Sequence, residues 1–86
     1  MTRNELFAWA KENEKKYLIL GQIKETIIDD ITFIELPVKY GKYKGIYFCE
    51  RNDPVADNLR QDGYAVGVNA NYEIIQSYIL ECVKRL

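Results

Sequence analysis

Three stretches of this chain are apolar at consecutive positions rather than at alternate ones: residues 18–20, 46–49 and 65–68. A strand with one face in water alternates apolar and polar side chains, whereas a strand covered on both faces is a continuous apolar run. The pattern therefore predicts a sheet that is apolar on both faces. Each face must be covered by the chain's own helices or by a partner chain.

The length and charge of the chain narrow the classes of protein to which it can belong. Its 86 residues predict a single domain over 1–86, and the 48% of apolar residues exclude a disordered chain. Lys and Arg number 12 against 13 Asp and Glu, whereas a protein whose whole surface binds nucleic acid would be strongly basic. No stretch approaches the roughly 18 apolar residues of a membrane span, and the first residues lack the apolar run of a secretory signal. We therefore expect a cytoplasmic protein without a membrane partner.

Capping residues predict where the first two helices begin. Thr2 and Glu5 have the spacing of a capping box, so a helix should run over 3–16. Asp53 suits the N-cap of a second helix, because Pro54 lacks the N–H group that would go unpaired at the first helical position.

A glycine and two asparagines mark the boundaries of the next helix. Gly63 should end the second helix, and either Asn69 or Asn71 should cap a third one that runs to about residue 85. The apolar face of this last helix consists of Tyr72, Ile75, Ile79, Cys82 and Leu86, and it is widened by Ile74, Tyr78 and Val83. Such a stripe is typical of a helix packed on a core.

Strands are predicted over residues 17–23, 31–38, 46–49 and 64–68. Asp29 and Asp30 are the expected turn residues between the first two strands. Short connections make the first three strands an antiparallel meander, and the third and fourth strands enclose a helix and should be parallel. The predicted fold is an α/β (mixed α+β) domain in the order α-β-β-β-α-β-α. Its four-stranded mixed sheet combines the meander with one parallel βαβ unit, and three helices pack on it.

The residue types that usually carry catalysis or bind metal ions are scarce. The chain has no histidine, and Cys49 and Cys82 stand 33 positions apart, which matches no zinc spacing. Neither a Walker A motif nor a Gly-x-Gly-x-x-Gly motif occurs. We therefore expect a non-enzymatic protein without a metal or cofactor, in which both cysteines are small buried apolar residues.

An alternative hypothesis makes Cys49 a nucleophile. This residue ends a predicted strand just before a helix, and a helix N-terminus lowers the pKa of a thiol. The chain offers no histidine to act as its base. A deep pocket lined by Cys49, Arg51 and Asn52 would be the structural sign of an enzyme.

Another alternative concerns the acidic residues around the first turn: Glu25, Asp29, Asp30 and Glu35. Hard divalent cations bind carboxylate oxygens, but the spacing fits no EF-hand loop. A polar turn flanked by surface acids is therefore the favoured interpretation.

Residues 39–45 combine lysine with tyrosine in one short segment, at Lys39, Tyr40, Lys42, Tyr43 and Lys44. Lysine supplies phosphate contacts and tyrosine offers a stacking face, which is the pairing that binders of single-stranded nucleic acid use. The alternative is a solvated turn whose lysines keep the sheet edge from pairing with other chains. Three charges alone would give weak, salt-sensitive binding, which favours the turn.

The seven tyrosines of the chain suggest the kind of function. Tyrosine is enriched at protein interfaces, and Tyr40 and Tyr43, placed in a turn, are expected to be exposed contact residues. We expect a small interaction or regulatory domain that binds another protein or itself, for example as a homodimer. The alternative is a nucleic-acid-binding protein that uses the Lys/Tyr-rich turn at 39–45.

Overall fold

The computed structural model describes residues 1–68 and 70–85. Along this part of the chain the elements are α1 (Arg3–Asn13), the 3-10 helix η1 (Leu18–Gln22), β1 (Lys24–Ile28), β2 (Ile31–Leu36), β3 (Ile46–Phe48), α2 (Pro54–Gln61), β4 (Ala65–Gly67) and α3 (Tyr72–Lys84). Within these residues no helix is both long enough and apolar enough to cross a membrane.

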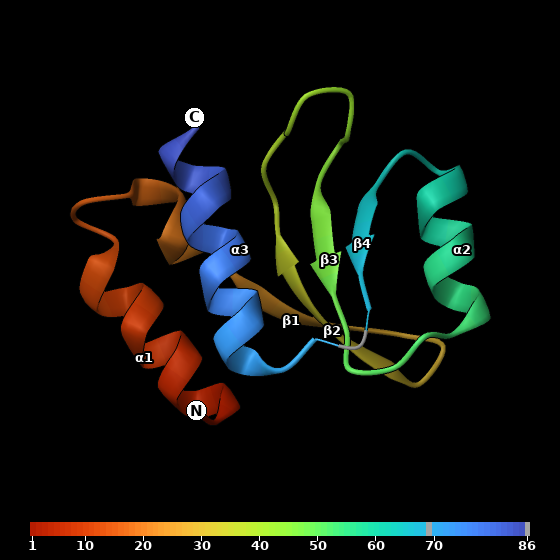
Figure 1. Cartoon of the computed structure of the whole chain (residues 1–86), viewed down its shortest axis with the longest axis horizontal. Helices are drawn as coiled ribbons and strands as arrows, with labels where there is room; N and C mark the ends of the chain where they lie inside the picture. The colour runs from red at the N-terminus through yellow and green to blue at the C-terminus, as the bar shows by residue number, and fades with distance from the viewer. Residues whose placement is uncertain (69, 86) are drawn as a thin grey trace.

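The four strands form one mixed sheet in the order β1-β2-β3-β4 (Figure 1). β2 pairs antiparallel with β1 and with β3, and β4 pairs parallel with β3. The predicted fold class is therefore confirmed, including the antiparallel meander, the parallel βαβ unit and the order α-β-β-β-α-β-α of helices and strands.

The prediction of a strand over residues 17–23 is wrong. Most of this segment is η1, in which the backbone hydrogen bonds are local: the Leu20 N–H donates to the Tyr17 carbonyl at 2.9 Å. Leu20 is buried but Leu18 is 82% exposed, so the apolar run covers the end of the core instead of entering the sheet. The first strand is β1, which follows directly.

The turn between β1 and β2 lies where it was predicted. Ile28 pairs with Ile31, so Asp29 and Asp30 alone form a two-residue turn. Their φ angles are 49° and 65°. Positive φ at both positions matches the twist of the flanking strands, which is why such turns join short antiparallel hairpins.

The predicted helix boundaries are close to those observed. The capping box of α1 is present, but α1 ends at Asn13 rather than at residue 16. Asp53 caps α2, and Gly63 follows its end with a φ of 99°. Asn71 caps α3 by accepting from the Ile74 N–H at 2.9 Å. Asn69 and Leu86, which the sequence placed at the two ends of this helix, lie outside the described residues.

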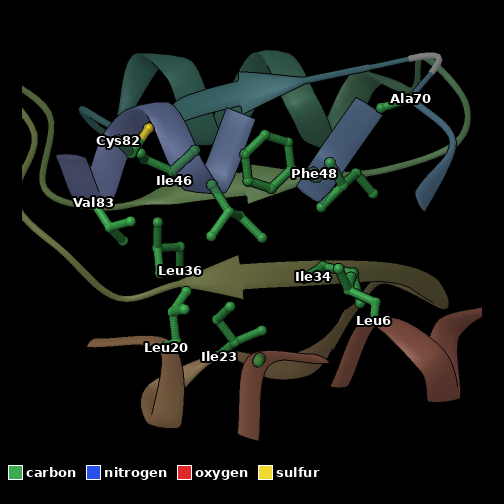
Figure 2. Packing of buried hydrophobic residues seen from close by; sticks show 13 residues of the cluster. Leu6, Leu20, Ile23, Ile34, Leu36, Ile46, Phe48, Ala70, Cys82 and Val83 are labelled. Atoms are coloured by element: carbon green, nitrogen blue, oxygen red, sulfur yellow. The ribbon is translucent and has the colours of Figure 1, made fainter. Parts of the chain in front are cut away.

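The helices divide between the two faces of the sheet, with α1 and α3 on one side and α2 on the other (Figure 1). The buried residues of the larger cluster, drawn as sticks in Figure 2, are Leu6, Ala10, Leu20, Ile23, Ile34, Leu36, Ile46, Phe48, Ala70, Ile75, Ile79, Cys82 and Val83. Those of the smaller cluster, under α2, are Phe33, Tyr47, Cys49, Val55 and Leu59. Adjacent residues of β3 enter different clusters, since Tyr47 belongs to the smaller one and Phe48 to the larger one. The sheet is therefore apolar on both faces, as predicted.

Candidate functional site

A groove of about 270 Å³ lies between α3, the segment of Tyr40 and Tyr43, and strands β3 and β4. Its floor is formed by Ile46, Phe48, Ala65, Val66 and Gly67, and its walls by Tyr40, Tyr43, Tyr78, Glu81 and Cys82. Because α2 packs on the opposite face, no helix of the described chain fills this space. We call it the α3 groove.

Tyr78 forms the rim of the α3 groove on the helix side. Its ring stacks on the ring of Phe48, and 49% of the residue is exposed. Ile74, one helical turn earlier, is 41% exposed. Ile74 is not among the residues that line the groove, so of these two side chains only Tyr78 borders it. The exposed Leu18 and Ile27 lie on other elements, and single exposed apolar residues of that kind are ordinary on protein surfaces.

The two tyrosines of the predicted binding segment line the same groove. Tyr40 and Tyr43 exchange two backbone hydrogen bonds, of 3.1 and 2.9 Å, across the turn at 41–42. They are half-buried rather than exposed, which corrects the expectation from the sequence. Tyr40 packs against the larger cluster, and both residues line the groove. The Arg85 guanidinium donates to the Tyr40 hydroxyl at 2.8 Å, and this bond raises the pKa of Arg85. The turn is thus fixed to the end of α3.

The three lysines of that segment lie outside the lining of the α3 groove. Lys39, Lys42 and Lys44 are exposed. The Lys42 ammonium lies 5.6 Å from the centre of the Tyr43 ring, and the Lys44 ammonium lies 5.3 Å from that of Tyr64. The structure therefore gathers Tyr40 and Tyr43 in one site and leaves the lysines on the solvent side of the turn.

The reasoning from the sequence missed the contribution of α3 to this site. Tyr78 and Ile74 were assigned to a widened apolar stripe, but the core covers only part of that stripe. The signal was its width: a stripe broader than one packed face leaves apolar residues at its margin. When such a helix lies next to a sheet that ends in a short strand, the margin of its stripe is expected to stay uncovered on the side of that strand.

A second cavity, of about 320 Å³, lies beyond the end of β3 and includes Cys49 and Arg51 but not Asn52. The Cys49 thiol donates to the Arg51 carbonyl at 3.0 Å, and burial raises its pKa. A thiol that stays protonated at neutral pH is a poor nucleophile. The Arg3 guanidinium at this cavity pairs with Glu25 at 2.7 Å. The Cys49 thiol is therefore not activated as a thiolate by this arrangement.

Two of the acidic residues near the first turn, Glu25 and Glu35, bind other side chains of the protein. Glu25 pairs with Arg3, and Glu35 accepts from the Thr26 hydroxyl at 2.9 Å. The Lys24 ammonium lies 3.7 Å from the same Glu35 oxygen. Among the described residues no group of three or more His, Cys, Asp or Glu side chains could hold a metal ion.

No protein-family model matches the chain. The searches of curated proteins and of solved structures gave no significant match.

Proposed function

We propose that this protein acts by binding another protein chain through the α3 groove. The observation that supports this proposal is an open, largely apolar groove whose rim includes the half-exposed ring of Tyr78. Contiguous exposed apolar surface with a polar rim is typical of interaction sites on small proteins.

The side chains around the groove suit protein recognition. Tyrosine contributes a large ring, a polar tip and little rotamer entropy, and it is enriched among the residues that dominate binding energy. The hydrogen bond from Arg85 to Tyr40 and the stacking of Tyr78 on Phe48 hold two of these rings before a partner arrives. Such preorganisation lowers the entropic cost of association.

The expected affinity is modest. Complete burial of one large apolar side chain contributes about 1.5–3 kcal/mol. Tyr78 is 49% exposed, so burial of the rest of its ring supplies only part of such a contribution, and the other residues that line the groove must supply the remainder. A partner therefore has to contact Tyr78 and the groove lining together.

Site-specific photo-crosslinking in the source cells tests the proposal. A benzophenone amino acid in place of Tyr78 should form a discrete adduct with a protein, which can be this chain or another one. The same group in place of Leu18, which is 82% exposed on η1, is the matched control. The adduct should disappear when Ala65→Leu fills the groove floor.

Two results would oppose the proposal. Equal crosslinking from positions 18 and 78, or an adduct that Ala65→Leu leaves unchanged, would show contact without use of the groove. An adduct that is removed by nuclease treatment would support the nucleic-acid alternative instead.

A further inference from the structure

We infer that the cavity of about 320 Å³ beyond the end of β3 binds a small zwitterion with one carboxylate and one ammonium group, such as an apolar α-amino acid. The lining of this cavity has Phe48 in common with the α3 groove and otherwise consists of different residues. The inference is therefore independent of the function proposed above.

The cavity lies where the path of the chain divides between the two faces of the sheet. β3 and β4 are parallel, and the chain runs from β3 to α2 on one face but from β4 to α3 on the other (Figure 1). Open α/β sheets bind ligands at the carboxyl ends of such strands, where the diverging connections leave a crevice. Phe48, at the carboxyl end of β3, and Tyr72, at the start of α3, both line the cavity. The cavity thus has the position of a ligand site.

Charged side chains of both signs line the cavity: Arg3, Arg51, Asp30 and Glu50. They meet because β2 and β3 are antiparallel, so that the turn before β2 lies beside the segment that follows β3. Arg3 already pairs with Glu25 at 2.7 Å. Among the described residues, the ion pairs do not include the other three side chains. The cavity therefore offers a ligand one guanidinium and two carboxylates.

A zwitterion satisfies both kinds of charge at once. The planar guanidinium of Arg51 can donate two parallel hydrogen bonds to a carboxylate. An ammonium group has three donors, so Asp30 and Glu50 can both accept from it. A purely anionic ligand would be repelled by the two carboxylates, and a purely cationic one would be repelled by Arg51.

The remaining lining and the volume indicate the size and polarity of the ligand. Ile34, Phe48 and Ile75 are buried members of the larger cluster that also line the cavity, and they favour an aliphatic side chain on the ligand. Sites for small molecules occupy roughly 300–1,000 Å³, and this cavity is at the lower end of that range. A ligand of amino-acid size therefore fits better than a nucleotide.

Titration of the ¹⁵N-labelled chain with L-alanine, L-valine and L-leucine, followed by amide chemical shifts, tests the inference. We expect saturable shifts at Thr32, Glu50, Arg51 and Tyr72, with a dissociation constant below about 1 mM for L-leucine. Two analogues of leucine test the need for both charges, since 4-methylpentanoate lacks the ammonium group and 3-methylbutylamine lacks the carboxylate. Each analogue should bind at least about tenfold more weakly than L-leucine.

Substitutions that remove charge with little change in shape test the assigned residues. Arg51→Gln, and the double change Asp30→Asn with Glu50→Gln, should each raise the dissociation constant for L-leucine at least about tenfold. Asparagine adopts positive φ readily, so Asp30→Asn keeps the turn. Arg60→Gln removes an arginine of α2 that lies outside the cavity lining, and it should leave the constant unchanged. Circular dichroism verifies that each variant is folded.

Three results would overturn the inference. One is the lack of saturable shifts with all three amino acids up to about 10 mM. The others are equal binding of L-leucine and its two analogues, and an affinity that the charge substitutions leave unchanged, because both would show that the charged lining does not select the ligand. None of these results bears on the α3 groove, which the crosslinking at position 78 tests separately.

Discussion

The ring of Tyr78 lies almost parallel to the ring of Phe48, with centroids 6.2 Å apart and an angle of 9° between the planes. Phe48 is buried in the larger cluster, whereas Tyr78 is 49% exposed. One face of the Tyr78 ring thus contributes to the packing of α3 on β3, and the remainder is exposed at the rim of the α3 groove. Substitutions at this position should therefore affect both stability and binding.

Tyr78→Ala should lower the free energy of unfolding by about 1–2 kcal/mol, because it removes an aromatic pair and the apolar area that the pair buries. Urea denaturation of the monomer measures the loss. Tyr78→Phe keeps the ring and should stay close to the parent chain. Leu18→Ala should change the free energy of unfolding by no more than about 0.5 kcal/mol, and losses of equal size at positions 18 and 78 would contradict this account.

Asp30→Gly should raise the free energy of unfolding by roughly 0.5 kcal/mol. Asp30 has a φ of 65°, a conformation that glycine adopts without the steric cost that other residues bear. The gain is small because glycine also has more conformational freedom in the unfolded chain. Thermal unfolding followed by circular dichroism gives the shift in melting temperature.

The reverse change at Gly63 is the matched test of the same principle. Its φ is 99°, and a Cβ there would lie 3.0 Å from the Cε of Lys44. Gly63→Ala should therefore lower the free energy of unfolding by about 1 kcal/mol or more. A stabilising Gly63→Ala would show that backbone strain does not decide the outcome at these turns.

Stability should fall at alkaline pH. Burial raises the pKa of the Tyr47 phenol above its ordinary 10.0 and the pKa of the Cys49 and Cys82 thiols above 9.0. The folded chain therefore binds these protons more tightly than the unfolded chain does. Their contribution is fully present below pH 9 and is lost as the pH rises through the folded-state pKa values.

Melting temperatures measured between pH 7 and pH 11 test the alkaline effect. Tyr47→Phe should flatten the decline above pH 10, and replacement of both cysteines by alanine should flatten the part that begins near pH 9. A melting temperature that does not change over this range would refute the assignment.

The nucleic-acid alternative has its own test. Lys42 and Lys44 lie over tyrosine rings on the solvent side of the turn, away from the groove lining. On the protein-binding proposal, any weak affinity for single-stranded DNA or RNA at low salt should survive the double change Lys42→Glu and Lys44→Glu. An affinity that falls with both changes and with added salt would support phosphate contacts at this turn.

Much of the fold was predictable because strong local signals agreed with each other. The capping box at Thr2, the Asp53-Pro54 pair and the Asp29-Asp30 turn are each determined by a few adjacent residues, and each is present. The runs of apolar residues predicted a sheet covered on both faces, and the two clusters have that arrangement. These features depend on local chemistry and on the period of the pattern.

The first strand was not predictable from its apolar content. Residues 18–20 are apolar but belong to η1, whereas β1 has charged and exposed residues because it is an edge strand. The sequence indicated the position of β1 only through the two-residue turn, because β-branched residues stand directly before Asp29. Short apolar runs do not distinguish a strand from a helical turn, and tertiary packing decides between them.

The candidate site was half predictable. Tyr40 and Tyr43 were expected to be contact residues, and both line the α3 groove. Tyr78 was assigned to the apolar stripe of the last helix, because the sequence does not reveal which part of the sheet that helix covers. The covered part depends on the order of the strands and on the face of the sheet on which α3 packs.

The chain reaches β4 by way of α2 and then crosses back to lay α3 on the opposite face (Figure 1). α2 and β4 therefore have fewer packing partners than the central elements. β4 is an edge strand that pairs with β3, and α2 packs on the smaller cluster. Units held by few buried contacts open at a lower free energy than the rest of a protein. Amide protons of α2 and β4 should accordingly exchange with solvent before those of β2 and α3. Because Ala65 and Gly67 of β4 form part of the groove floor, the same local opening should change the width of the α3 groove.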